Sequence, residues 1–186
     1  MTGQINGKIL VDIARGAIAE AFGVDQLPVP QERWLNQPGA TFVTLTEGGE
    51  LRGCIGTLQA HRPLEEDVRD NALAAAFRDP RFLPLTREEF SNIEVEVSLL
   101  TATQPLTFTD EADALAQLRP GIDGVVFEYG RYRSTFLPQV WESFSQPREF
   151  LAMLKRKAGL PEDFWEEGVK LSRYTVTKWI EKKNSP

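Results

Sequence analysis

The residue of this 186-residue chain most suited to covalent chemistry is its single cysteine, Cys54, in the segment LRGCIGTL, residues 51–58. In a strand, Arg52, Cys54 and Gly56 would share one face because side chains alternate. An arginine beside the thiol would favour the thiolate and lower the pKa of the cysteine. Gly53 and Gly56 leave the backbone bare for a ligand. The segment predicts a reactive or binding surface; the alternative is a small buried cysteine.

A second group of polar side chains lies in residues 92–100, where apolar and polar residues alternate as in a half-buried strand. Glu94, Glu96 and Ser98 would share its polar face. Neighbouring carboxylates can raise one pKa and supply a general base. The alternative is a solvated sheet face.

Together these segments suggest a catalytic set. Cys54 would be the nucleophile or covalent carrier, Arg52 its electrostatic activator, and Glu96 a base or orienting group. The only histidine, His61, lies seven residues past the cysteine. A Cys–His dyad is one interpretation and a solvated turn histidine the other.

Four further residues are candidate substrate ligands, together with Gly53, Gly56 and Ser98. Asn71 and Arg81 lie near a helix-to-loop junction, where they can tie the loop or, for Arg81, clamp an anionic ligand. Thr135 and Gln139 place hydrogen-bonding groups beside an aromatic residue, which suits a binding wall.

The remaining motifs predict no cofactor and no metal site. One cysteine and one histidine fall short of a four-ligand zinc set. No glycine-rich phosphate-binding loop appears in the sequence. A basic run, residues 155–157, is interpreted as a solvated helix face.

The composition is that of a globular protein, with 41% hydrophobic and 26% charged residues. The net charge of -6 disfavours a nucleic-acid partner, although a local basic patch would escape this test. No apolar stretch approaches the roughly 20 residues of a membrane span. The first residues lack the apolar run of a signal peptide. We therefore expect a soluble, cytoplasmic protein without a membrane partner.

Periodicity and turn residues predict the order of elements. Asn6 would cap the first helix, Gly48-Gly49 would close a hairpin, Thr86 with Glu89 would cap a short helical turn, and Gly159 would end the last helix. Because hairpins imply antiparallel pairing, the pattern favours an α+β fold with antiparallel or mixed sheets packed by helices. The expected helices are 6–22, 64–78, 110–118 and 147–158; the expected strands are 41–46, 51–58, 92–100, 122–129, 133–137 and 169–180.

Several segments, in order, resemble the AMMECR family. The RGCIG run at 52–56 is its hallmark motif. The blocks NALAAA at 71–76, DPRF at 79–82, EVSLL at 96–100 and TFLPQVW at 135–141 follow in register. A YRS stretch at 132–134 stands where the family would have a glycine. The resemblance covers nearly the whole chain and implies a single domain of this type over residues 1–186.

The resemblance implies an α+β protein of two unequal lobes that form a cleft, with the cysteine motif near it. Prokaryotic members resemble the A component of the AmmeMemoRadiSam set. The companions in that set are a Memo-type protein and a radical-SAM protein. The leading hypothesis is therefore an enzyme, or enzyme component, that uses a reactive cysteine with these partners. A non-catalytic binding or adaptor module and an RNA-modification or RNA-binding role are the alternatives.

Overall fold

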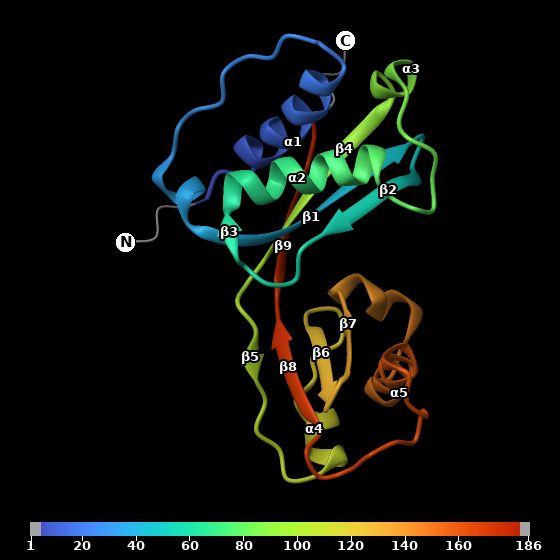
Figure 1. Ribbon diagram of the computed structural model, residues 1–186. Helices are drawn as coiled ribbons and strands as arrows, with labels where there is room; N and C mark the ends of the chain where they lie inside the picture. The colour runs from blue at the N-terminus through green and yellow to red at the C-terminus, as the bar shows by residue number, and fades with distance from the viewer. Residues whose placement is uncertain (1–4, 183–186) are drawn as a thin grey trace. The chain divides into compact units, whose positions relative to one another are not determined.

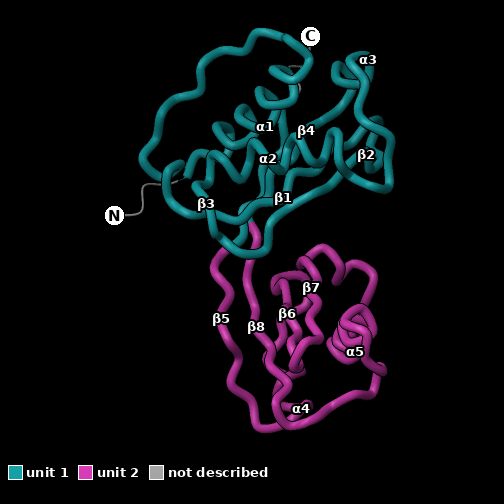
Figure 2. The backbone as a smooth tube through the Cα atoms, in the orientation of Figure 1, with its two compact units in different colours: residues 1–100, 177–186 teal, residues 101–176 magenta. Residues whose placement is uncertain are grey.

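The structure is a computed structural model that describes residues 5–182, and it divides into two compact units (Figures 1 and 2). Unit 1 holds the described residues up to Leu100 together with those from Thr177 onward. Unit 2 is Thr101–Val176. Each unit has its own sheet and its own apolar core. The fold is α+β with antiparallel sheets packed by helices, as predicted.

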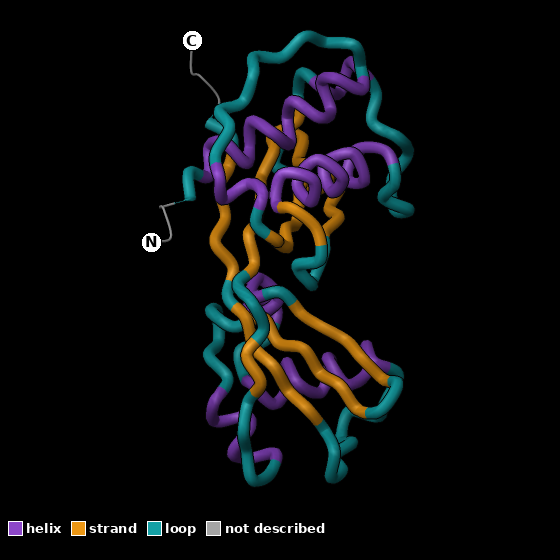
Figure 3. Tube along the Cα trace, turned by 60° about the vertical axis from the view of Figure 1, so that its left-hand side comes forward, coloured by secondary structure: helices purple, strands orange, loops and turns teal. Residues whose placement is uncertain are grey.

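Unit 1 is built on a sheet in the strand order β2-β1-β4-β9. In Figure 3 the two long helices, drawn in purple, lie over one face of this sheet. These elements are β1 (Pro38–Glu47), β2 (Glu50–Gly56), β4 (Ile93–Leu100), β9 (Val176–Ile180), α1 (Gly7–Ala21) and α2 (Leu64–Phe77). A short strand, β3 (Arg62–Pro63), pairs with the start of β1.

Alternation along the strands decides which residues meet the helices. Val43 and Leu45 of β1 and Val95 and Val97 of β4 are fully buried in one cluster with residues of α1 and α2. Burying such side chains stabilises the fold by about 1.5–3 kcal/mol each. The polar residues between them lie on the opposite face, as the alternation in residues 92–100 predicts.

Local signals fix the ends of these elements as predicted. The side chain of Asn6 accepts a hydrogen bond from the Lys8 amide and caps α1. The turn between β1 and β2 places Gly48 and Gly49 at φ values of 58° and 87°, a conformation that suits glycine. Thr86 forms a capping box at the short helix α3 (Arg87–Phe90).

Unit 2 contains a sheet in the order β5-β8-β6-β7. Its core forms around Phe127, Phe150 and Leu154, and Trp141 stacks on the Phe150 ring at a centroid distance of 3.8 Å. The elements are β5 (Gln104–Pro105), α4 (Glu111–Gln117), β6 (Gly124–Tyr129), β7 (Tyr132–Phe136), α5 (Pro147–Ala158) and β8 (Lys170–Tyr174). Two 3-10 helices, η1 (Arg33–Asn36) in unit 1 and η2 (Pro138–Ser143) in unit 2, complete the set.

The single strand predicted over residues 169–180 is wrong, because the chain changes sheets within it. β8 ends at Tyr174 in the sheet of unit 2, and β9 begins at Val176 in the sheet of unit 1. At the break, Thr175 exchanges backbone and side-chain hydrogen bonds with Thr101. Alternation continues through the break, so the sequence pattern does not reveal it.

The basic run on α5 also differs from the prediction of a solvated face. Lys155 is buried, and its Nζ lies 2.5 Å from a carboxylate oxygen of Glu111. The ammonium also lies over the Trp165 ring, 5.5 Å from its centroid. Arg156 and Lys157 are exposed.

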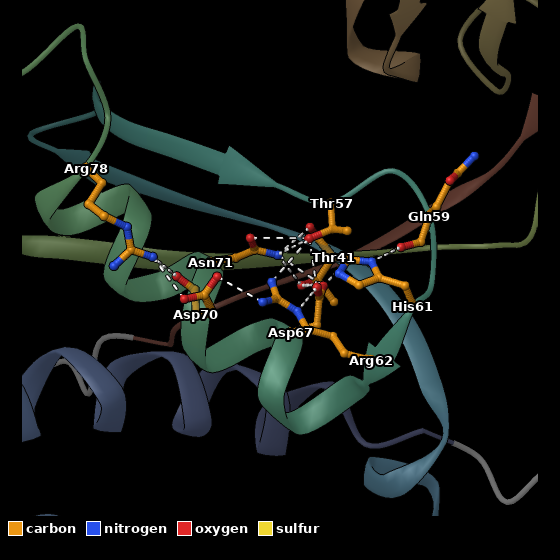
Figure 4. A network of polar contacts seen from close by, with 9 residues as sticks. All are labelled: Thr41, Thr57, Gln59, His61, Arg62, Asp67, Asp70, Asn71 and Arg78. Atoms are coloured by element: carbon orange, nitrogen blue, oxygen red, sulfur yellow. Dashed lines mark hydrogen bonds and ion pairs between the residues drawn. The ribbon is translucent and has the colours of Figure 1, made fainter.

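A buried polar network ties the end of β2 to α2 (Figure 4). The fully buried carboxylate of Asp67 accepts hydrogen bonds from the Thr41 amide and hydroxyl at 2.8 and 2.7 Å. It also accepts from the Thr57 hydroxyl, Arg62 Nε and Asn71 Nδ2. Because the donors come from β1, from the segment after β2, from β3 and from α2, this carboxylate fixes the segment that follows the cysteine motif.

Asp67→Ala should lower the free energy of unfolding by about 3–5 kcal/mol, because it removes the buried acceptor of the Thr41 amide, of the Thr41 and Thr57 hydroxyls and of Arg62 Nε. Asp70→Ala is the matched control. Asp70 also pairs with Arg62, but its side chain is 47% exposed, so its loss should cost less than about 1 kcal/mol. Urea denaturation measures both values. Equal losses in the two variants would contradict the role given to the network.

Candidate functional site

The sheet of unit 1 carries a row of polar side chains on the face opposite α1 and α2. Cys54 of β2 pairs with Thr44 of β1, which pairs with Glu96 of β4. The Thr44 hydroxyl donates to Cys54 Sγ at 3.3 Å. Lys178 of β9 places its Nζ 3.9 Å from Glu96 Oε2. A thiol, a hydroxyl, a carboxylate and an ammonium therefore follow one another across four strands.

The next row of the same face has an aromatic ring at its centre. Phe42 pairs with Gly56 on one side and with Ser98 on the other. Ser98 is buried, and the Glu96 side chain is 19% exposed. Glu96 and Ser98 thus share the face of Cys54, but β1 lies between. Neighbouring strands are about 4.8 Å apart, so the Cα atoms of Glu96 and Cys54 are separated by roughly 10 Å.

A β-bulge interrupts the pairing of β2 with β1 just before the cysteine. Leu51 pairs with Thr46 and Gly53 pairs with Leu45, so Arg52 is the extra residue of the bulged strand. The predicted alternation of Arg52 and Cys54 on one regular strand face is therefore wrong.

The guanidinium of Arg52 binds groups other than the thiol. Its Nε and Nη2 donate to the Glu89 carboxylate at 2.8 and 3.2 Å, and Nη2 also donates to the Leu83 carbonyl at 2.9 Å. This pairing lowers the pKa of Glu89 to about 2, chiefly through the hydrogen bonds from Arg52. Arg52 anchors the loop before α3, and the role predicted for it as activator of Cys54 is wrong.

The outer edge of Cys54 is held by an ion pair from the loop after α2. The Cys54 amide donates to Asp79 Oδ2 at 2.9 Å, and Arg81 Nη2 donates to the Cys54 carbonyl at 3.3 Å. Arg81 also donates Nε and Nη2 to the Asp79 carboxylate at 3.0 and 2.8 Å. Arg81 thus lies beside Cys54, and its role as a clamp for an anionic ligand stays a prediction.

Burial raises the pKa of the Cys54 thiol above its ordinary value, contrary to the lowered pKa that we predicted. The hydrogen bond from Thr44 and the charge of Arg81 lower the pKa in part. The charges of Asp79 and Glu96 raise it further. The free protein therefore holds a thiol rather than a thiolate at neutral pH.

The glycines beside the cysteine serve packing rather than access. A Cβ on Gly53 would lie 2.2 Å from the Ala75 carbonyl oxygen of α2, and one on Gly56 would lie 2.2 Å from the Phe42 ring. Since protein atoms already fill both spaces, the interpretation that these glycines leave room for a ligand is wrong.

The other predicted residues are not members of this row. Asn71 is buried in the Asp67 network. His61 is exposed and its Nδ1 contacts the Gln59 carbonyl at 2.9 Å. Thr135 and Gln139 belong to unit 2, where the Thr135 hydroxyl contacts the Tyr174 hydroxyl at 3.0 Å and Gln139 is exposed in η2.

Sequence reasoning did not single out Thr44 or Lys178, although both lie in the row. Counting pairs outward from the Gly48-Gly49 turn assigns Gly53 to Thr44, because the count includes no bulge. Lys178 lies in a strand that the pattern assigned to one continuous element. Only the pairing between strands reveals either residue.

Among residues 5–182, no cluster of three or more His, Cys, Asp or Glu side chains could hold a metal ion. No helix in the same range is long and apolar enough to cross a membrane.

Comparison with known proteins places the chain in a family. The AMMECR1 family model matches residues 11–179. The chain belongs to the AMMECR1 family. A relative from Methanothermobacter thermautotrophicus is 40% identical over 173 residues, which are 90% of each chain. One from Sulfolobus acidocaldarius is 39% identical over 177 residues, 90% of this chain and 78% of that one.

A solved relative has the same fold. The crystal structure of uncharacterized protein PH0010 from Pyrococcus horikoshii aligns with a TM-score of 0.83 and 34% identity. The alignment covers 95% of this chain and 91% of that chain. The family and the α+β fold inferred from the motifs are thus confirmed.

Gly53→Ala should lower the free energy of unfolding by about 1–3 kcal/mol, because the new methyl group overpacks the contact between β2 and α2. Gly16→Ala in α1 is the control. Its Cβ would meet only ordinary contacts at 3.8 Å, so it should stabilise the helix by up to about 1 kcal/mol. Denaturant unfolding distinguishes the two. If Gly53→Ala leaves the free energy of unfolding unchanged, the close packing described between β2 and α2 would be contradicted.

The rate of Cys54 alkylation against pH should show a midpoint above the ordinary value for cysteine. Thr44→Val removes a donor to the sulfur and should raise the midpoint further. Glu96→Gln removes a negative charge and should lower it. Because Cys54 is the only cysteine, iodoacetamide labelling of the whole protein reports this thiol alone.

The control for these variants is Glu88→Gln in α3, an exposed carboxylate that does not act on the thiol. It should leave the midpoint unchanged. A midpoint that rises in Glu96→Gln or falls in Thr44→Val would contradict the electrostatics described for the row.

Proposed function

We propose that this AMMECR1-family protein is an enzyme or enzyme component whose chemistry uses Cys54 and which acts with Memo-type and radical-SAM partners. The observation that carries the proposal is the row of Cys54, Thr44, Glu96 and Lys178 on one sheet face. Thiols, carboxylates and ammonium groups are the usual means of covalent and acid–base catalysis. The partners come from the family resemblance alone.

The separation of the two reactive groups assigns them different tasks. With β1 between them, Glu96 and Cys54 share no hydrogen bond, so Glu96 does not take the thiol proton directly. Once its proton has passed to water, Cys54 would attack, or carry, one part of the substrate, while Glu96 accepts a proton from another part. Thr44, between them, donates to the sulfur and steadies the negative charge that forms there.

A non-catalytic adaptor is the second candidate, and the raised pKa of Cys54 favours it. A protonated thiol is a poor nucleophile. In this function Cys54 is a small half-buried residue, and the sheet face positions a substrate or partner for the other enzymes. The net charge of -6 gives no support to RNA binding as a third function.

Cys54→Ser tests the catalytic proposal in cells that express the chain together with a Memo-type and a radical-SAM protein. A product that requires all three proteins should fall at least about a hundredfold in this variant, because a hydroxyl does not replace a thiol nucleophile. Mass spectrometry of cell extracts measures the product, and thermal unfolding confirms the fold.

Glu88→Gln should leave the product at the wild-type level. Full product formation by Cys54→Ser would reject the catalytic role and support the adaptor. Loss of product together with loss of partner binding would mean that the sheet face recognises the partner.

A further inference from the structure

We propose that Asp79 and Arg81 are the positioning residues of the Cys54 site. Together they replace the strand that β2 lacks on its outer side, and Arg81 supplies the cation that faces the thiol. This inference rests on the proposed function, because a positioning role requires that Cys54 react.

The backbone of Cys54 needs such a partner because β2 is the edge strand of its sheet. An edge strand leaves alternate amides and carbonyls without a neighbour. Asp79 accepts from the Cys54 amide, and Arg81 donates to the Cys54 carbonyl. A neighbouring strand would offer the same acceptor and donor, so the ion pair takes the hydrogen-bonding place of the missing strand at this residue.

The ion pair is itself rigid. The Asp79 side chain is 1% exposed and accepts both side-chain donors and the backbone amide of Arg81. A two-point guanidinium–carboxylate contact fixes both the distance and the plane of the pair. The Phe82 ring lies 5.5 Å from the guanidinium. Hydrogen bonds from Arg81 hold the pKa of Asp79 well below its usual range, so the pair stays charged.

Arg81 takes the electrostatic role that the sequence assigned to Arg52. The charged groups that act on the thiol are Arg81, Asp79 and Glu96, and only Arg81 is a cation. Arg52 is not among these groups, and its guanidinium donates to Glu89 and to the Leu83 carbonyl instead. Arg81 also remains 54% exposed, so it reaches solvent beside the cysteine.

The test compares Arg81→Gln with Arg52→Gln. Arg81→Gln should move the midpoint of the alkylation rate to higher pH and slow alkylation at pH 8 at least about twofold, because the thiolate fraction falls. Alkylation by iodoacetate should slow more than alkylation by iodoacetamide, because iodoacetate is an anion that the Arg81 cation attracts and iodoacetamide is neutral. Arg52→Gln should lower thermal stability and leave the pH midpoint and the ratio of the two reagents unchanged.

Arg81→Lys keeps the charge and loses the two-point contact. It should retain the pH midpoint while the Cys54 amide exchanges its hydrogen with solvent faster than in the wild type. Arg81→Lys also tests the proposal by itself if Arg81→Gln fails to fold. A midpoint that moves in Arg52→Gln but not in Arg81→Gln, or that moves in Arg81→Lys as far as in Arg81→Gln, would overturn the proposal.

These readouts separate the inference from the function on which it rests. The pH midpoint and the reagent ratio report the field at the thiol whether or not the protein has turnover. Product formation in Cys54→Ser reports the function alone. Suppose that Arg81→Gln leaves the pH midpoint and the reagent ratio of alkylation unchanged, while Cys54→Ser loses the product. That result rejects the positioning role and leaves the catalytic proposal standing.

Discussion

One extra residue in β2 decides which face of the sheet carries the thiol. In a regular hairpin closed by the two-glycine turn, Cys54 would pair with Val43, whose side chain is buried beneath the helices. The bulge at Arg52 advances the register by one, so Cys54 pairs with Thr44 on the opposite face. Because side chains alternate with a period of two, this one-residue shift places every later side chain of β2 on the other face of the sheet.

The contacts around the motif serve that inverted register. Gly53 turns toward α2, where only a glycine fits beneath the Ala75 carbonyl. The bulged residue, Arg52, is anchored by Glu89, so its guanidinium is engaged there rather than at the thiol. Packing thus accounts for a glycine and an arginine that look functional in the sequence. The side chains that form hydrogen bonds with Cys54 belong instead to Thr44, Asp79 and Arg81, which lie outside the motif.

The sequence predicted those features that depend on near neighbours. The Asn6 cap, the glycine turn, the alternation of β4 and the helix stop at Gly159 are all local, and all are confirmed. The bulge, the change of sheets at Thr175 and the burial of Lys155 depend on partners distant in the chain. The alternation of residues 92–100 correctly predicts that Glu96 lies on the polar face of its strand. The prediction of Arg52 as the cation beside the thiol is wrong because adjacency in sequence is not adjacency in space.

The return of β9 to the first sheet makes unit 1 discontinuous, and this has a kinetic consequence. Trp179 packs on the core beside Gly7, Glu181 bonds to Val95 and Arg15, and all of unit 2 lies between these segments and β4 in the chain. As the chain leaves the ribosome, unit 2 has all its residues before unit 1 does. The sheet that carries the cysteine is therefore completed last, by contacts of high sequence separation, which fold slowly.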